Sequence, residues 1–322
     1  MPQNSIYYAV GRLSVLGQNA LDGARLERLM QAPTAAEARR ALSEMGWKED
    51  DDYARMAESH VEQACRTLRK LATDEKILDC FLLRYDVNNL KMLIKARCLG
   101  VEAQTLSPCG VYALDRLRHD VAEHRYADLA PELQAALDEL EKRLAVAVDP
   151  LDVDVSLDKA LYETIFAWLP DKARAERRYF TARADIVNLT IALRVLRMGK
   201  DAAFFSQLLL PCGSVGKGAW LKAFAQPEKL PLLVNKYGVK VYGAAIAAQM
   251  DPSRIAQLER AMDDYLLGVY SPYRRDLERP ERLVGYLLMR EREASAVRLI
   301  LAGKLAGFPN DKIRERLREL YA

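Results

Sequence analysis

The chain has 322 residues, of which 50% are hydrophobic and 29% charged, the balance of a globular protein long enough for two or three domains. Its 48 basic and 45 acidic residues leave a net charge of only +3, so the basic excess of a nucleic-acid binder is missing and no nucleic-acid partner is expected. Intrinsic disorder is excluded because it requires low hydrophobicity and high net charge.

The cysteine content predicts reduced thiols in a cytoplasmic protein, because five cysteines cannot all pair and no secretory signal opens the chain. No pair has Cys-x-x-Cys spacing, and there are only three histidines, so no zinc site and no cofactor are expected. No apolar run reaches the roughly 18–20 residues that span a bilayer. Any membrane association is therefore expected to be peripheral, or to be made through a partner protein.

Helical patterns follow one another along most of the chain. Thr34 with Glu37 three residues later predicts a capped helix that begins at Ala35. Further on, residues 89–96 carry an apolar stripe at helical spacing. The same one-sided stripe recurs at Leu133, Leu137, Leu140 and Leu144. An all-α fold follows.

Helix boundaries are also indicated in the sequence. The β-branched run 146–155 is interrupted by aspartates and a proline, and it is predicted to be a linker into a helix that begins near Ser156. A last helix is expected over residues 312–320. Three glycines are predicted to end helices in the left-handed conformation: Gly100, Gly199 and Gly307.

An internal repeat organises the chain. The segments that begin at Arg84 and Arg183 both read Arg-x-Asp-x-x-Asn-Leu, and in each the aspartate precedes a glycine by 14 residues. A weaker third copy begins at Glu293, which also lies 14 residues before a glycine. The three acids are spaced by 99 and 108 residues. The candidate polar residues of the three copies are Arg84, Asp86 and Asn89, then Arg183, Asp185 and Asn188, then Glu293 and Arg298.

A second marker gives nearly the same period. The tripeptide Pro-Cys-Gly occurs at Pro108 and again at Pro211, 103 residues later. Cutting at these prolines predicts three similar helical lobes, 1–107, 108–210 and 211–322. Small helical units of this kind bury their apolar faces by packing on their neighbours.

Two roles are open for the repeated polar residues. Asp and Asn three residues apart share one face of a helix, and the arginine either pairs with the acid or reaches a neighbouring helix. The residues then either form polar networks that fix the packing of each unit, or line a cavity or partner-contact surface.

The sequence contains no recognisable set of catalytic residues, so no enzymatic activity is expected. No Ser/His/Asp or Cys/His set is recognisable, and His60, His119 and His124 lie in charged helical stretches where we expect surface positions. The glycine-rich stretch 213–218 lacks the spacing of a phosphate loop.

Two arginine clusters, at 174–178 and 274–282, are either solvated mixed-charge faces or docking patches for an acidic protein or an anionic membrane surface.

The residues 7–12, 81–91 and 293–307 together resemble segments of a known family. That family is the C subunit of bacterial and archaeal V/A-type rotary ATPases, the counterpart of the d subunit in the eukaryotic vacuolar enzyme. The resemblance covers the whole chain, including the repeat. This chain departs from the pattern at Ala296, where the first two copies have Asn, and at Trp47, where a Tyr is expected.

The resemblance implies a funnel of three helical lobes around a pseudo-threefold axis. One copy per complex is implied to sit on the membrane proteolipid ring and to receive the foot of the central shaft subunits. The implied role is non-catalytic: a central-stalk rotor component, cytoplasmic and peripherally attached to the membrane, that couples shaft rotation to ring rotation during ion transport. The alternative is a soluble helical-repeat adaptor that binds a peptide or a regulatory protein.

Overall fold

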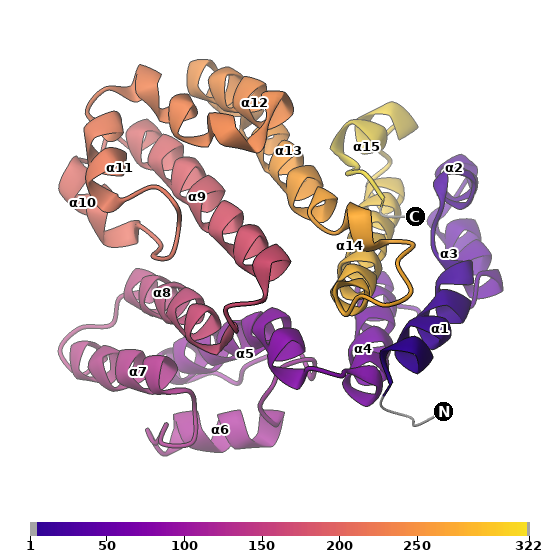
Figure 1. Ribbon diagram of the computed structural model, residues 1–322, viewed down its shortest axis with the longest axis horizontal. Coiled ribbons are helices and arrows are strands. Elements are labelled where there is room, and N and C mark those ends of the chain that lie inside the picture. The colour runs from indigo at the N-terminus through magenta and orange to yellow at the C-terminus, as the bar shows by residue number, and fades with distance from the viewer. Residues whose placement is uncertain (1–4, 321–322) are drawn as a thin grey trace. The chain divides into compact units, whose positions relative to one another are not determined.

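The computed structural model describes residues 5–320, and every regular element in this range is a helix (Figure 1). The all-α prediction is therefore confirmed. The chain divides into two compact units, the first made of the described residues up to Leu78 and from Asp263 onwards, the second of Asp79–Met262. The three-lobe division and the funnel remain predictions.

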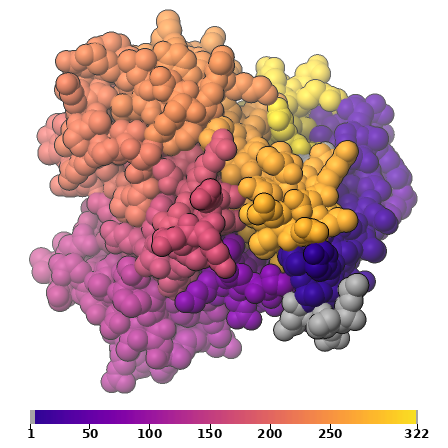
Figure 2. Space-filling model, viewed as in Figure 1, coloured from indigo at the N-terminus to yellow at the C-terminus, as the bar shows by residue number. Residues whose placement is uncertain are grey.

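The first unit joins segments from near both ends of the sequence. Helix α14 packs against α1, α3, α4 and α15, and Figure 2 shows the indigo N-terminal segment directly against the gold side chains of α14. The elements of this unit are α1 (Ile6–Leu16), η1 (Gly17–Asn19), α2 (Gly23–Gln31), α3 (Ala35–Glu44), α4 (Tyr53–Leu71), η4 (Ser271–Tyr273), α14 (Glu281–Leu305) and α15 (Asn310–Arg316).

The core of the first unit lies where α2, α3, α14 and α15 meet. Leu29 and Leu42 are fully covered there, and each such side chain contributes about 2 kcal/mol through removal from water. Gly303 of α14 has no side chain at the point where Ile313 of α15 packs, and a Cβ there would lie 2.7 Å from Ile313 Cδ1. The small residue allows α15 to dock.

The second unit is built around two long helices, α5 and α9. Buried aromatic rings of both helices meet in its core, with Phe81 and Phe180 centroids 4.7 Å apart. Helix α5 enters this unit at Asp79, and α13 leaves it at Met262. Its elements are α5 (Glu75–Leu99), α6 (Leu114–Ala122), α7 (Pro131–Leu144), α8 (Pro150–Trp168), α9 (Arg174–Arg197), α10 (Ala202–Leu208), α11 (Lys217–Phe224), η2 (Pro227–Tyr237), α12 (Val239–Met250), η3 (Pro252–Arg254) and α13 (Ile255–Gly268).

The three long helices α5, α9 and α14 end in the same way. Gly100, Gly199 and Gly307 have φ of 66°, 65° and 70°, the left-handed conformation that glycine adopts without steric cost. In each case the N–H of the next residue bonds the carbonyl five residues earlier, at 2.9–3.2 Å. This is the Schellman arrangement, so the three predicted helix ends are confirmed.

The capped helix at Ala35 is also confirmed, since the Thr34 hydroxyl accepts the Glu37 N–H at 3.2 Å. The predicted linker 146–155 is wrong in its second half, because α8 already begins at Pro150. Asp149 accepts the Leu151 N–H at 2.8 Å and caps the helix, with proline in the first position. The β-branched residues that follow suggested a strand-like or irregular segment and concealed this start.

The last helix is shorter than the predicted range 312–320. It begins two residues earlier, at Asn310, and ends at Arg316. Leu317 leaves the helix in an extended conformation and is buried in the core of the first unit. The next residues are held by polar contacts, in which Arg318 pairs with Asp263 and the Glu319 N–H bonds Asp264 at 3.2 Å.

Within the described range, no helix combines the length and the apolar character needed to cross a membrane.

Candidate functional site

The first copy of the repeat is a polar lock between α5 and the Pro-Cys-Gly loop. The Asp86 carboxylate accepts the backbone N–H groups of Val111 at 2.5 Å and Tyr112 at 3.2 Å. One turn further along α5, the Asn89 amide donates to the Ser107 carbonyl at 2.8 Å and accepts the Ser107 N–H at 2.9 Å. Both side chains are buried, and the loop is held on each side of its proline.

The second copy repeats this geometry atom for atom. Asp185 of α9 accepts the N–H groups of Ser214 and Val215, both at 3.2 Å. Asn188 donates to the Leu210 carbonyl at 3.0 Å and accepts the Leu210 N–H at 2.7 Å. In both copies the Asn binds the residue before the proline, and the Asp binds the two residues after the glycine.

Additional groups surround Asp185 in the second copy. The hydroxyls of Ser214 and Tyr237 both donate to its carboxylate at 2.5 Å, and Lys236 Nζ lies 3.1 Å from it. Asp185 is fully buried, so these contacts replace the water that its charge would otherwise require.

The glycine of each Pro-Cys-Gly tripeptide is required by the lock. A Cβ at Gly110 would lie in hard contact with the Asp86 carboxylate, and a Cβ at Gly213 would meet that of Asp185. Any larger residue would push the loop away from the helix. The shared tripeptide and the shared acid are therefore two halves of one contact, which explains why they repeat with nearly the same period.

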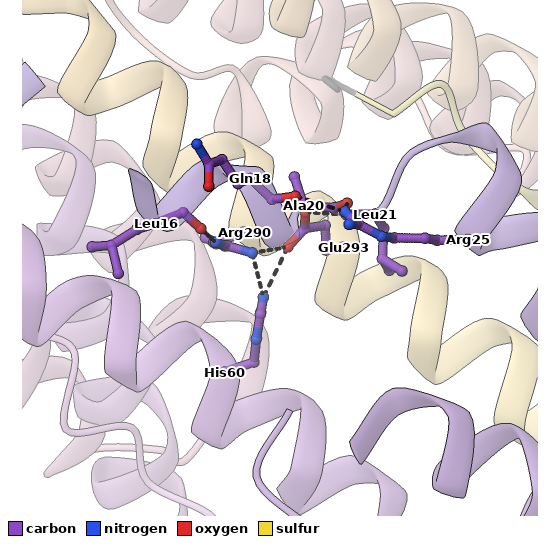
Figure 3. Close-up of polar contacts among 8 residues, drawn as sticks. All are labelled: Leu16, Gln18, Ala20, Leu21, Arg25, His60, Arg290 and Glu293. Carbon is purple, nitrogen blue, oxygen red and sulfur yellow. Dashed lines mark hydrogen bonds and ion pairs between the residues drawn. The ribbon is translucent and has the colours of Figure 1, made fainter. Parts of the chain in front are cut away.

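The third copy uses different partners in the first unit (Figure 3). Glu293 of α14 accepts the Leu21 N–H at 2.8 Å, and its other oxygen lies 2.8 Å from both Arg290 Nη1 and His60 Nε2. Arg290 also donates to the Leu16 carbonyl at 2.6 Å. The acid again holds a loop, here the turn between α1 and α2. In the first two copies an asparagine makes the second set of bonds to the loop. Ala296 stands at that position here and has no polar side chain, and Arg290 provides the second bond to the turn instead.

Burial and charge shift the pKa values in this cluster. Burial alone would raise the pKa of Glu293, but hydrogen bonding by His60 and the charge of Arg290 outweigh it and lower this pKa below 4.5. Burial lowers the pKa of His60 from 6.5, against the opposing attraction of Glu293. The neutral His60 ring stacks on Trp47, with centroids 3.6 Å apart. The cluster therefore holds one ion pair, Arg290 with Glu293, and one neutral histidine.

The arginines of the repeat have different surroundings. Arg84 lies over the Tyr85 ring at 5.2 Å, and Arg298 forms a partly exposed ion pair with Glu58 at 3.6 Å. Arg183 lines a pocket of about 270 Å³ between α8 and α9, beside Tyr162. Burial raises the pKa of Tyr162 to about 12, and Arg183 acts in the opposite direction.

The repeated acids and amides are thus buried inside their own units, bonded to loops. This arrangement favours the packing role, and partner contact by Arg84, Asp86, Asn89, Arg183, Asp185, Asn188, Glu293 and Arg298 stays a prediction.

The sequence interpretation missed two members of the third cluster. His60 was expected on the surface, but its side chain is only 10% exposed because it faces Glu293. Arg290 could have been found, since it lies three residues before Glu293 on the same helix face. His60 carries no comparable signal, because its partner is 233 residues away. His119 and His124 are exposed, as expected.

Comparison with known proteins gives a match along nearly the whole chain. The sequence model described as ATP synthase (C/AC39) subunit matches residues 9–316. The V-type sodium ATPase C subunit of Enterococcus hirae is 23% identical, over 84% of each chain. The V-type ATP synthase C subunit of Deinococcus radiodurans is 23% identical, over 98% of this chain and 92% of the relative. The A-type ATP synthase C subunit of Haloquadratum walsbyi is 26% identical, over 73% and 72%.

We predict that Gly110→Ala lowers the free energy of unfolding by about 2 kcal/mol, because the new methyl group displaces the loop from Asp86. Gly218→Ala is the matched control, since a Cβ at Gly218 meets nothing within 4 Å. Its stability should be unchanged or raised by up to about 1 kcal/mol. Urea denaturation measures both, and equal stabilities of the two variants would contradict the lock.

A pH dependence follows from the third cluster. His60 and Glu293 both bind protons less readily in the folded chain, so acidification favours unfolding, first below pH 6.5 through His60 and then below 4.5 through Glu293. Between about pH 7 and about pH 5, the unfolding free energy should fall less steeply with decreasing pH in His60→Gln than in the wild type. The difference in slope is at most about 1.4 kcal/mol per pH unit, the value for one proton.

The control for this measurement is His119→Gln, which changes an exposed histidine and should keep the wild-type slope. Denaturant titrations at closely spaced pH values provide the slopes. An unchanged slope in His60→Gln would show that His60 does not titrate with folding.

Proposed function

Because the chain belongs to the ATP synthase (C/AC39) subunit family, we propose that it is a non-catalytic component of the central stalk of a V/A-type ATPase. The observation that carries the proposal is the extent of the match, which runs over residues 9–316 and so includes all three copies of the repeat. In this role the chain couples rotation of the central shaft to rotation of the membrane proteolipid ring during ion transport, with one copy per complex.

The polar locks support a coupling role. A part that transmits torque must resist deformation, and loops that are bonded to rigid helices through buried carboxylates have few alternative positions. The locks at Asp86, Asp185 and Glu293 each tie a loop to the middle of a long helix. These buried contacts stiffen each repeat without any chemical reaction.

Ion pairs between helices add to this stiffness. Within the second unit, Lys91 and Lys95 of α5 contact Asp158 and Asp154 of α8 at 2.6 and 2.7 Å, and Arg194 of α9 contacts Glu259 of α13 at 2.6 Å. Within the first unit, Arg298 of α14 contacts Glu58 of α4. Each long helix is thus connected to another helix by at least one ion pair. Each partly exposed pair stabilises the fold by at most about 1 kcal/mol.

The proposed location is the cytoplasmic face of a membrane, with attachment through the proteolipid ring. The three lobes would surround the axis where the foot of the shaft is received. Two protein partners of this kind each need a contact of about 1,000 Å² or more for stable binding.

We predict that an affinity-tagged copy of this chain, isolated in mild detergent, brings down both the shaft subunits and the proteolipid ring. The matched control is a strain that carries the tag alone. A ring–shaft assembly that isolates intact from cells lacking this chain would contradict the proposal. Small-angle scattering of the isolated chain tests the alternative of a solenoid adaptor, which requires an elongated particle in place of a compact one.

A further inference from the structure

A pocket of about 350 Å³ opens in the first unit between α1, the η1 turn, the start of α2 and the start of α14. Its size is within the range of small-molecule sites. Leu13, Tyr286 and Met289 form its apolar lining, and all three are buried. The polar lining is dominated by three arginines, Arg25, Arg274 and Arg282.

These arginines have no carboxylate partner among residues 5–320. Arg25 donates to the carbonyls of Gln18 at 2.9 Å and Ala20 at 2.5 Å. Arg282 donates to the Ser14 hydroxyl at 2.7 Å and the Asp276 carbonyl at 3.2 Å. Arg274 is exposed at the rim, and its side chain bonds to none of the described residues. Neutral oxygens orient two of the guanidinium groups but leave their charge uncompensated.

The charge of the lining is strongly one-sided. Asp22 is the single carboxylate on the pocket wall within the described chain, and one of its oxygens is used to accept the Arg25 N–H as the cap of α2. Three arginines and one aspartate leave a formal charge of +2. The N-terminal ends of α2 and α14 add partial positive charge at the same place.

We propose that this pocket binds a phosphate-bearing anion. A phosphate monoester carries about −1.5 to −2 charges at pH 7, which matches the +2 of the lining. The planar guanidinium group forms paired hydrogen bonds with phosphate oxygens. The apolar lining takes the organic part of the ligand. A lipid headgroup and a soluble phosphate compound share this chemistry.

The pocket wall is held in place by the third polar lock. Arg290 bonds the Leu16 carbonyl and Glu293 bonds the Leu21 N–H, on either side of the turn that carries Gln18 and Ala20 (Figure 3). That turn also positions the Arg25 guanidinium through two carbonyls. The site is therefore pre-organised by buried contacts, which lowers the entropic cost of binding a ligand.

The test is calorimetric titration of the full-length chain with inorganic phosphate. The ionic strength is low and is kept equal in all titrations with chloride salt. Saturable binding is expected, and Arg274→Gln and Arg282→Gln should each weaken it about tenfold or more. Arg275→Gln is the matched control, because it removes the neighbouring exposed arginine that does not line the pocket, and it should bind as the wild type does.

Absence of saturable phosphate binding would overturn the proposal, as would equal binding by Arg274→Gln and Arg275→Gln or recognition of an acidic peptide in place of phosphate. Circular dichroism verifies folding, and Arg274, at the exposed rim, provides the variant least able to disturb it. Vesicles that contain phosphatidic acid identify the source. Arg274-dependent sedimentation with them assigns a lipid headgroup, and phosphate binding without sedimentation assigns a soluble phosphate compound.

Discussion

The structure depends on a single kind of contact, a buried carboxylate in the middle of a long helix that accepts backbone N–H groups from a distant loop. A loop packed into the protein interior must find partners for its N–H groups, because an unsatisfied buried group costs about 1–3 kcal/mol. Asp86 and Asp185 supply these partners, and the neighbouring asparagines hold the other side of each loop. The glycine in the loop permits the close approach.

The third copy shows how the same contact can be rebuilt with other residues. Glu293 is one methylene longer than aspartate, and its loop lies near the N-terminus of the chain instead of following the helix. Arg290 and His60 complete the cluster, and Ala296 stands where the earlier copies have asparagine. The different turn that results also forms one wall of the arginine-lined pocket. Divergence in this copy thus also shapes a pocket that is lined by three arginines.

Much of the fold could be predicted from the sequence because the signals are local. Periodic leucines, the Thr34 cap and the three glycines each act within a few residues, and the structure contains them all. The repeat identified the important acids, but their role as loop anchors could not be derived, because each bond spans at least 25 residues. His60 was assigned to the surface for the same reason. The start of α8 was missed because β-branched residues outweighed the Asp149-Pro150 signal.

The proposed role in torque transmission and the network of loop locks are consistent with one another, because a coupler works only if its loops keep their positions under load. Amide hydrogen exchange in the two Pro-Cys-Gly loops tests the locks most directly. In Asp86→Asn, exchange at Val111 and Tyr112 should accelerate about tenfold while Ser214 and Val215 keep their protection, and Asp185→Asn should give the reverse pattern. Unchanged protection of both loops in both variants would contradict the account.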